Sequence, residues 1–83
     1  MTEVFLSERA RDRLSDLEPE TRERVKDALR DLNPDRDLSR LSGKDVYSIR
    51  VGDYRAIADW DRQEGAVYVL TVGHRRNIYD RDW

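Results

Sequence analysis

The sequence predicts an α+β fold whose elements follow the order β-α-α-β-β-β. In the first half of the chain, apolar residues recur at helical spacing, whereas from Val46 onward they alternate with a period of two. The dipeptide Gly52-Asp53 stands between two alternating runs, which is typical of a two-residue hairpin turn. We therefore expect an antiparallel sheet packed against an N-terminal helical hairpin.

The N-terminal half predicts one strand and two helices. Residues 2–6 form the strand, and Ser7 followed by Glu8 is a helix N-cap with an acidic first turn. Proline is tolerated at the first position of a helix, so Pro19 begins a second helix, which Asn33-Pro34 ends. The apolar stripes of the two helices comprise Ala10, Leu14 and Leu17, and then Val25, Ala28, Leu29 and Leu32.

The C-terminal half predicts a three-stranded meander. Residues 35–44 are a polar connection anchored by Leu38 and Leu41, and the strands cover residues 46–51, 54–60 and 66–73. One face of the first hairpin should meet the helices, and it carries Tyr47, Ile49, Val51, Tyr54, Ala56 and Ala58. The opposite face should be a mixed polar surface open to a ligand, and it carries Val46, Ser48, Arg50, Arg55, Ile57 and Asp59.

Size and composition narrow the class of protein. With 83 residues, we expect a single domain over residues 1–83. The absence of cysteine excludes disulfides and thiolate zinc sites, and one histidine leaves few metal ligands, so neither metal nor cofactor is expected. Because the N-terminus does not resemble a signal peptide and no apolar run approaches a membrane span, we expect a cytoplasmic protein without membrane contact.

The arginines of the hairpin carry the main functional signal. In a two-residue hairpin, Arg50 lies directly opposite Arg55, and like charges so placed destabilise the sheet unless an anion lies between them. The planar guanidinium group matches phosphate bidentately. The last strand ends in His74-Arg75-Arg76, and Tyr79 follows within reach as a ring for stacking or a phenol for hydrogen bonding. This cluster suits RNA.

A simpler interpretation is open at this point. The arginines are then solvated residues at strand ends, paired with Asp53, Asp59 or Asp80. His74 is either a structural or exposed histidine, or a proton carrier. The larger aromatic residues are core or sheet-packing residues rather than stacking platforms, namely Tyr47, Tyr54, Trp60 and Tyr68.

The order of elements and several short motifs resemble the RelE/ParE superfamily of toxin–antitoxin toxins over nearly the whole chain, with the RelE branch closest. The motifs are Leu41-Ser42-Gly43, Tyr47-Ser48-Ile49-Arg50, Gly52-Asp53-Tyr54-Arg55, and Val72-Gly73-His74-Arg75 through to Tyr79. The resemblance implies a metal-independent, ribosome-dependent endoribonuclease that cleaves messenger RNA by attack of a 2′-hydroxyl on the phosphodiester. It also implies a cognate antitoxin as partner, with operator DNA bound only through the antitoxin complex.

The resemblance also implies roles for individual residues. Arg50 and Arg55 would stabilise the charge on phosphorus, Arg75 or His74 would donate a proton, and Tyr79 would orient the substrate. Where RelE carries a lysine two residues before Arg50, this chain has a serine, which removes a cation from the expected site. The general base stays open.

Two other functions fit the same resemblance. A ParE-like toxin would inhibit gyrase without cutting nucleic acid. An inactive member would only bind its antitoxin and, through it, operator DNA, and both the serine at position 48 and the net charge of −2 favour that alternative.

Overall fold

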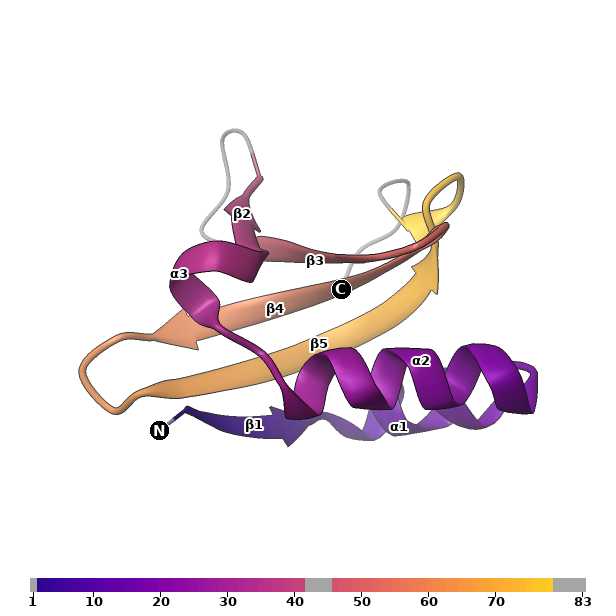
Figure 1. Cartoon of the computed structure of the whole chain (residues 1–83), viewed down its shortest axis with the longest axis horizontal. Coiled ribbons are helices and arrows are strands. Elements are labelled where there is room, and N and C mark those ends of the chain that lie inside the picture. The colour runs from indigo at the N-terminus through magenta and orange to yellow at the C-terminus, as the bar shows by residue number, and fades with distance from the viewer. Residues whose placement is uncertain (1, 42–45, 79–83) are drawn as a thin grey trace.

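The computed structural model describes residues 2–41 and 46–78, which form three helices and a five-stranded sheet (Figure 1). The elements in chain order are β1 (Glu3–Leu6), α1 (Glu8–Ser15), α2 (Pro19–Arg30), α3 (Pro34–Asp37), β2 (Leu38–Arg40), β3 (Tyr47–Val51), β4 (Tyr54–Asp61) and β5 (Ala66–His74). The α+β class, the two N-terminal helices and the β3-β4-β5 meander are confirmed.

The sheet has the order β1-β5-β4-β3-β2 and is not wholly antiparallel. β1 pairs in parallel with β5, with Glu3 opposite Ala66 and Leu6 opposite Val69. All the other helices and strands lie between β1 and β5 in the sequence, and the last strand, β5, then pairs with the first. This pairing joins segments far apart in sequence, which the local alternation of apolar residues does not specify.

The connection expected over residues 35–44 contains two short elements that the sequence did not predict. Pro34 begins α3, in the first helical position where proline loses no hydrogen bond, and the chain then extends as β2. Leu38 lies opposite Ile49 in the pairing of β2 with β3, and it packs against the core. Leu38 therefore anchors this segment as predicted, but as the start of an edge strand. Leu41, the other expected anchor, donates a 2.9 Å backbone hydrogen bond to Val46.

Ser7 caps α1 and also ties this helix to the sheet. Its hydroxyl oxygen accepts a 3.0 Å hydrogen bond from the Ala10 amide, and the hydroxyl donates a 2.8 Å bond to the Leu70 carbonyl on β5. The predicted N-cap is thus confirmed. The second bond fixes α1 against β5, so Ala10 and Leu14 are buried in the core.

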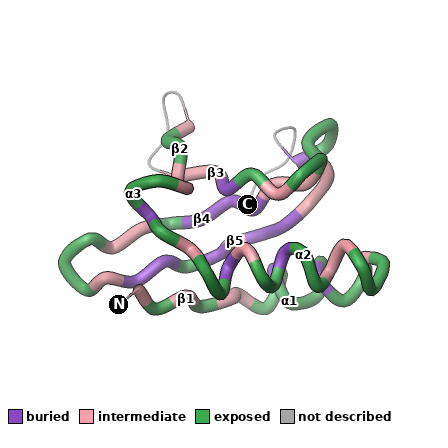
Figure 2. The backbone as a smooth tube through the Cα atoms, viewed as in Figure 1, coloured by how far each residue is buried: buried purple, intermediate pink, exposed green. Residues whose placement is uncertain are grey.

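The helices cover one face of the sheet, and this face holds the main core (Figure 2). Ile49, Ala56 and Ala58 are buried there, as predicted for the helix-facing side of the hairpin. None of the helices in the described ranges 2–41 and 46–78 has the length and apolar character that a membrane crossing requires.

The opposite face is less open than the sequence predicted. Ile57, expected on a mixed polar surface, is completely buried, and Thr71, its partner on the neighbouring strand β5, is only 6% exposed. Ile78, beyond the end of β5, is 4% exposed and lies over this same face at Gly73. The chain after β5 therefore covers part of the face, while Arg50 near the turn and the stacked rings of Phe5 and Tyr68 farther along the sheet stay exposed.

Candidate phosphate-binding site

The β3–β4 turn forms as predicted. Gly52 has a φ of +58°, a conformation that glycine adopts without strain. The register places Val51 opposite Tyr54 and Arg50 opposite Arg55. Two cationic side chains therefore start from directly opposed positions on one face of the sheet, which is an unfavourable arrangement for a sheet without a ligand.

The two arginines differ in their surroundings. Arg55 is half-buried, and its Nη1 donates 2.8 Å hydrogen bonds to the carbonyls of Gly52 and Tyr54, so its guanidinium group is held over the turn. Arg50 is exposed, and within residues 2–41 and 46–78 no hydrogen bond or ion pair involves its side chain. The pair thus supplies one fixed cation and one that is free to meet an anion.

Arg75 reaches the same turn from the end of β5. Its backbone amide donates a 2.9 Å hydrogen bond to the Asp53 carbonyl, and its Nε lies 3.8 Å from the Asp53 carboxylate. The simpler interpretation of the sequence, an arginine paired with Asp53, is therefore correct for Arg75. Both partners are exposed, so the ion pair is weak and a stronger anionic ligand can replace the carboxylate.

His74 is half-buried beside the turn and packs edge-on against Tyr54, with 5.4 Å between ring centroids. Its Nδ1 accepts a 3.2 Å hydrogen bond from the Arg76 amide. In the neutral ring this bond places the proton on Nε2, which makes Nε2 a donor. In this form Nε2 can donate a hydrogen bond to a phosphate oxygen, whereas transfer of a proton to a leaving oxygen requires the imidazolium.

Two further positions from the sequence complete the comparison. Ser48 is half-buried on the same face as Arg50 and lies opposite Ser39 on one side and Ile57 on the other. Tyr79, predicted to orient the substrate, lies outside the described residues. The fold thus brings Arg50, Arg55, Arg75 and His74 to one end of the sheet.

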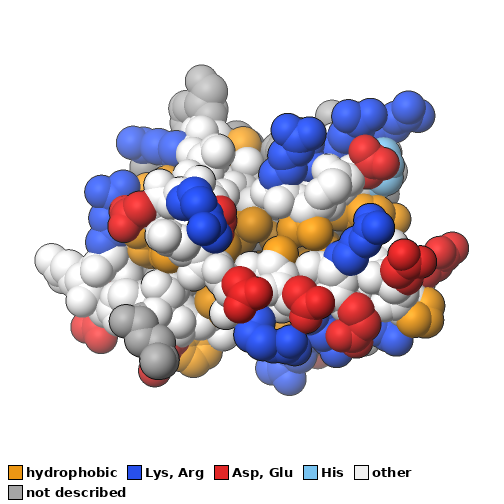
Figure 3. All heavy atoms as spheres, in the orientation of Figure 1, with side chains coloured by type: hydrophobic (Ala, Val, Ile, Leu, Met, Phe, Trp, Pro, Cys, Tyr) orange, Lys and Arg blue, Asp and Glu red, His pale blue; other side chains and the backbone are white. Residues whose placement is uncertain are grey.

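Arginine side chains gather at this end. Figure 3 shows basic side chains, with the single histidine and an acidic side chain beside them, over the end of the sheet that carries the β3–β4 turn. Acidic and basic side chains are interspersed along α2 below, and further basic side chains lie over the end of the molecule that carries α3.

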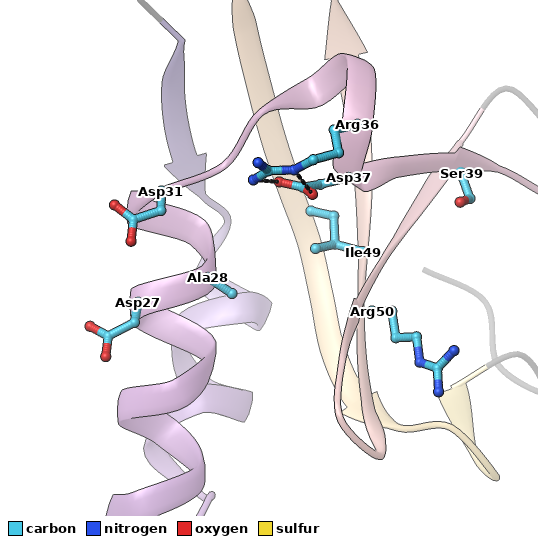
Figure 4. Close-up of a pocket in the computed structure, with 8 residues that line it drawn as sticks. All are labelled: Asp27, Ala28, Asp31, Arg36, Asp37, Ser39, Ile49 and Arg50. Carbon is cyan, nitrogen blue, oxygen red and sulfur yellow. Dashed lines mark hydrogen bonds and ion pairs between the residues drawn. The ribbon is translucent and has the colours of Figure 1, made fainter.

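A cleft of about 490 Å³ lies between α2 and β3 and was not predicted from the sequence. Figure 4 shows its lining residues, in which Arg50 on β3 points away from α2; the lining comprises Asp27, Ala28, Asp31, Arg36, Asp37, Ser39, Ile49 and Arg50. Three of these side chains are aspartates, which oppose the binding of a phosphate here.

An ion pair in α3 shapes one side of this cleft. Arg36 Nε donates a 2.8 Å hydrogen bond to Asp37, and the Asp37 carboxylate also accepts one from the Asn33 amide. The hydrogen bond from Arg36, and then that from Asn33, lower the pKa of Asp37, and the same bond to Asp37 raises the pKa of Arg36. The only sequence signal for this pair was Arg36-Asp37 following a proline, which is too common to single out.

Comparisons with known proteins agree on one superfamily. Residues 4–79 match the family model of the ParE toxin of type II toxin–antitoxin systems (parDE). The RelBE2 toxin–antitoxin complex of Mycobacterium tuberculosis contains a chain that is 26% identical, with a TM-score of 0.79, covering 92% of this chain and 93% of that one. The archaeal RelE–RelB complex of Pyrococcus horikoshii is 22% identical, with a TM-score of 0.71 and coverage of 92% and 97%.

The intact Escherichia coli RelBE complex shares the fold at 23% identity and a TM-score of 0.68, with coverage of 89% and 96%. A search of curated protein sequences gives no significant match. The family model carries the name of the ParE branch, whereas these solved structures carry that of the RelE branch.

Proposed function

The chain belongs to the ParE toxin family of type II toxin–antitoxin systems, and from this membership we propose that it acts as a ribosome-dependent endoribonuclease that cleaves messenger RNA. The observation that carries the proposal is the gathering of Arg50, Arg55 and Arg75 around one turn at the exposed end of the sheet. The likeness to a chain of the RelBE2 complex supports the RelE type of activity over others.

The reaction is attack of a ribose 2′-hydroxyl on the adjacent phosphorus. A bond forms between the 2′-oxygen and phosphorus, the bond from phosphorus to the 5′-oxygen breaks, and the products are a 2′,3′-cyclic phosphate and a 5′-hydroxyl. The attacking hydroxyl loses its proton to a base, and the leaving oxygen gains one from an acid. The pentacoordinate intermediate carries extra negative charge, which cations placed around it stabilise.

Each arginine has a separate part in this scheme. Arg55, fixed on two carbonyls of the turn, supplies a preorganised cation, and Arg50 closes on the phosphate from the opposed strand position. The Arg75 guanidinium exchanges the Asp53 carboxylate for a phosphate oxygen. Tyr79 orients the base next to the cut by stacking or hydrogen bonding.

His74 donates the proton to the 5′-oxygen from Nε2 of the imidazolium and is left as the neutral ring, whose Nδ1 accepts the hydrogen bond from the Arg76 amide. An alternative is that the Arg75 guanidinium acts as the donor. Ser48 is a poor base at the usual pKa of a hydroxyl, so the base for the 2′-hydroxyl comes from the ribosome or the RNA.

The same family membership leads us to propose a cognate antitoxin as the partner. Structural relatives are known in complex with RelB antitoxins, from Mycobacterium tuberculosis, Escherichia coli and Pyrococcus horikoshii. Operator DNA would be bound only through such a complex. The proposed reaction requires messenger RNA as the substrate and the ribosome as the place of cleavage, so we propose that the protein acts in the cytoplasm.

The experiment is primer extension on a messenger RNA incubated with the purified chain, with and without ribosomes. Cuts should appear only with ribosomes present, and Arg75→Ala should reduce the cutting rate by about 100-fold or more. Arg62→Ala is the matched control, because Arg62 is an exposed arginine that follows β4 at the end of this strand away from the β3–β4 turn. Cutting that is absent from the wild type, or unaffected by Arg75→Ala, would overturn the proposal.

A second candidate is a ParE-like gyrase inhibitor, which the match to the ParE family model favours. A supercoiling assay with purified gyrase separates the two, since only the gyrase inhibitor blocks supercoiling while leaving messenger RNA intact. If the chain does neither and its overexpression is harmless, it is an inactive member that only binds its antitoxin.

A further inference from the structure

The chain after β5 folds back on the end of its own strand. The Asn77 amide donates a 2.9 Å hydrogen bond to the His74 carbonyl, closing a turn, and Ile78 then returns to the sheet. With 4% of its surface exposed, Ile78 is one of the most buried residues outside the strands and helices. Residues 74–77 form a loop between the end of β5 and this buried side chain.

Ile78 lies where a side chain at position 73 would be. A Cβ added to Gly73 would lie 3.3 Å from Ile78 Cδ1, 3.6 Å from its Cβ and 3.8 Å from its Cγ1. A separation of 3.3 Å is tighter than ordinary van der Waals contact, so an alanine at position 73 would require the Ile78 side chain to shift by a few tenths of an ångström.

Gly73 is also the cross-strand partner of Arg55. The side-chain position of Gly73 therefore faces the same side of the sheet as Arg55 and Arg50. Ile57 and Thr71, the next pair along these strands on that face, are buried too. The Ile78 side chain therefore provides a buried apolar surface next to Arg55 on this face of the sheet.

We infer that the seating of Ile78 on Gly73 is a positioning contact that fixes Arg75 for its phosphate. Arg75 lies in the loop that this contact closes. On one side the loop is held by the bond from the Arg75 amide to Asp53, and on the other by Ile78. These two contacts together restrain the Arg75 backbone relative to the turn beside Arg55.

The inference rests on the proposed function only for its effect on catalysis. A purely structural role for Ile78 makes a different prediction, because it would lower the overall stability without changing the Arg75 loop in the folded protein. The two roles are therefore separated by measuring the loop itself, through hydrogen exchange of the Arg75 amide under native conditions.

Three variants make the test, all in the full chain. Gly73→Ala adds the crowding methyl group, Ile78→Val removes the Cδ1 that this methyl would meet, and the double variant combines them. In Gly73→Ala the Arg75 amide should exchange roughly tenfold faster than in the wild type, and kcat for messenger RNA cleavage should fall roughly tenfold with little change in KM. The double variant should recover both to within about threefold of the wild type, because its methyl group occupies the vacated space.

The inference is overturned if Gly73→Ala leaves the Arg75 amide exchange unchanged, or if Ile78→Val fails to reverse its acceleration. Thermal unfolding of the same variants shows whether any loss is merely global, in which case all amides of β5 accelerate together. If the wild type does not cleave messenger RNA, the proposed function falls, whereas the exchange measurements still decide whether Gly73 and Ile78 hold the Arg75 loop.

Discussion

The Arg75 amide donates a 2.9 Å hydrogen bond to the Asp53 carbonyl, while the side chains of the same two residues stand 3.8 Å apart as an ion pair. The backbone bond fixes the distance between β5 and the β3–β4 turn. The side-chain pair is exposed and places a carboxylate next to the proposed phosphate site. The backbone bond positions Arg75 for an anion, whereas the Asp53 carboxylate competes with that anion for the guanidinium group. Substitutions at Asp53 separate the two effects.

Asp53→Asn should tighten RNA binding, because it removes the negative charge beside Arg75 and keeps the carbonyl that accepts the Arg75 amide. We expect a several-fold lower Kd at low salt, with a smaller gain at high salt, and a Tm within about 2 °C of the wild type. Fluorescence anisotropy with a labelled RNA measures the change. Glu20→Gln, an exposed acid on α2, is the control and should leave Kd unchanged; equal gains in both variants would contradict a local effect.

Arg50→Gln should stabilise the fold and abolish the proposed cleavage of messenger RNA. Arg50 and Arg55 are directly opposed like charges, so removing one relieves a repulsion of about 0.2–1 kcal/mol, which corresponds to a Tm increase of roughly 1–6 °C. Thermal unfolding followed by circular dichroism gives the Tm, and primer extension gives the activity. Arg62→Gln, at an exposed position beyond the far end of β4, should change neither by a comparable amount. A lower Tm for Arg50→Gln would show that Arg50 does not oppose folding.

Ser7→Ala should be among the more destabilising polar substitutions, since one hydroxyl caps α1 and also binds the Leu70 carbonyl. We expect a loss of about 1–2 kcal/mol in the free energy of unfolding. Urea denaturation measures it. Ser15→Ala is the matched control, because the Ser15 hydroxyl bonds only to the exposed Arg11 carbonyl of its own helix, and its loss should stay within about 0.5 kcal/mol. Similar losses in the two variants would contradict a link from α1 to β5.

Asp37→Asn should remove part of the acid sensitivity of the fold. Hydrogen bonds from Arg36 and Asn33 lower the pKa of Asp37 below its usual 3.8, so the folded state holds this carboxylate charged more firmly than the unfolded chain does. The resulting stability is fully present above the usual aspartate pKa and disappears as the pH falls through the lowered folded pKa.

The stability difference between wild type and Asp37→Asn should therefore be constant near neutral pH and shrink below about pH 4. Urea denaturation at a series of pH values measures it. Asp35→Asn, in the same short helix, serves as the control. A difference that stays constant down to about pH 2 would contradict the role of the charged Asp37.

The β3–β4 hairpin illustrates what could be predicted from the sequence. Gly52-Asp53 between two alternating runs determines both the turn and the register, and so the opposition of Arg50 and Arg55, because a two-residue turn permits only one pairing. The N-cap at Ser7 was similarly predictable from local chemistry. Each of these features depends on residues close together in the chain.

The features that were missed are not specified by residue spacing along the chain. The parallel pairing of β1 with β5 and the short strand β2 follow from which segments meet in space. Period-two alternation placed Ile57 on the correct side of the sheet, but it did not predict that Ile57 is buried there or that Ile78 shares this face with it. The fold of the Arg55 guanidinium onto the carbonyls of Gly52 and Tyr54 depends on a side-chain rotamer, which spacing in the sequence does not specify.

Three successive carbonyls of the turn accept hydrogen bonds from two arginines: those of Gly52 and Tyr54 from the Arg55 side chain, and that of Asp53 from the Arg75 amide. Main-chain oxygens are present whatever the side chain, so the turn tolerates changes of residue type as long as a glycine supplies its positive φ. Its length is a different matter. One inserted residue would shift all three acceptors together and change the strand register, so among relatives the turn residues other than the glycine should vary in type, whereas the length of the turn should stay constant.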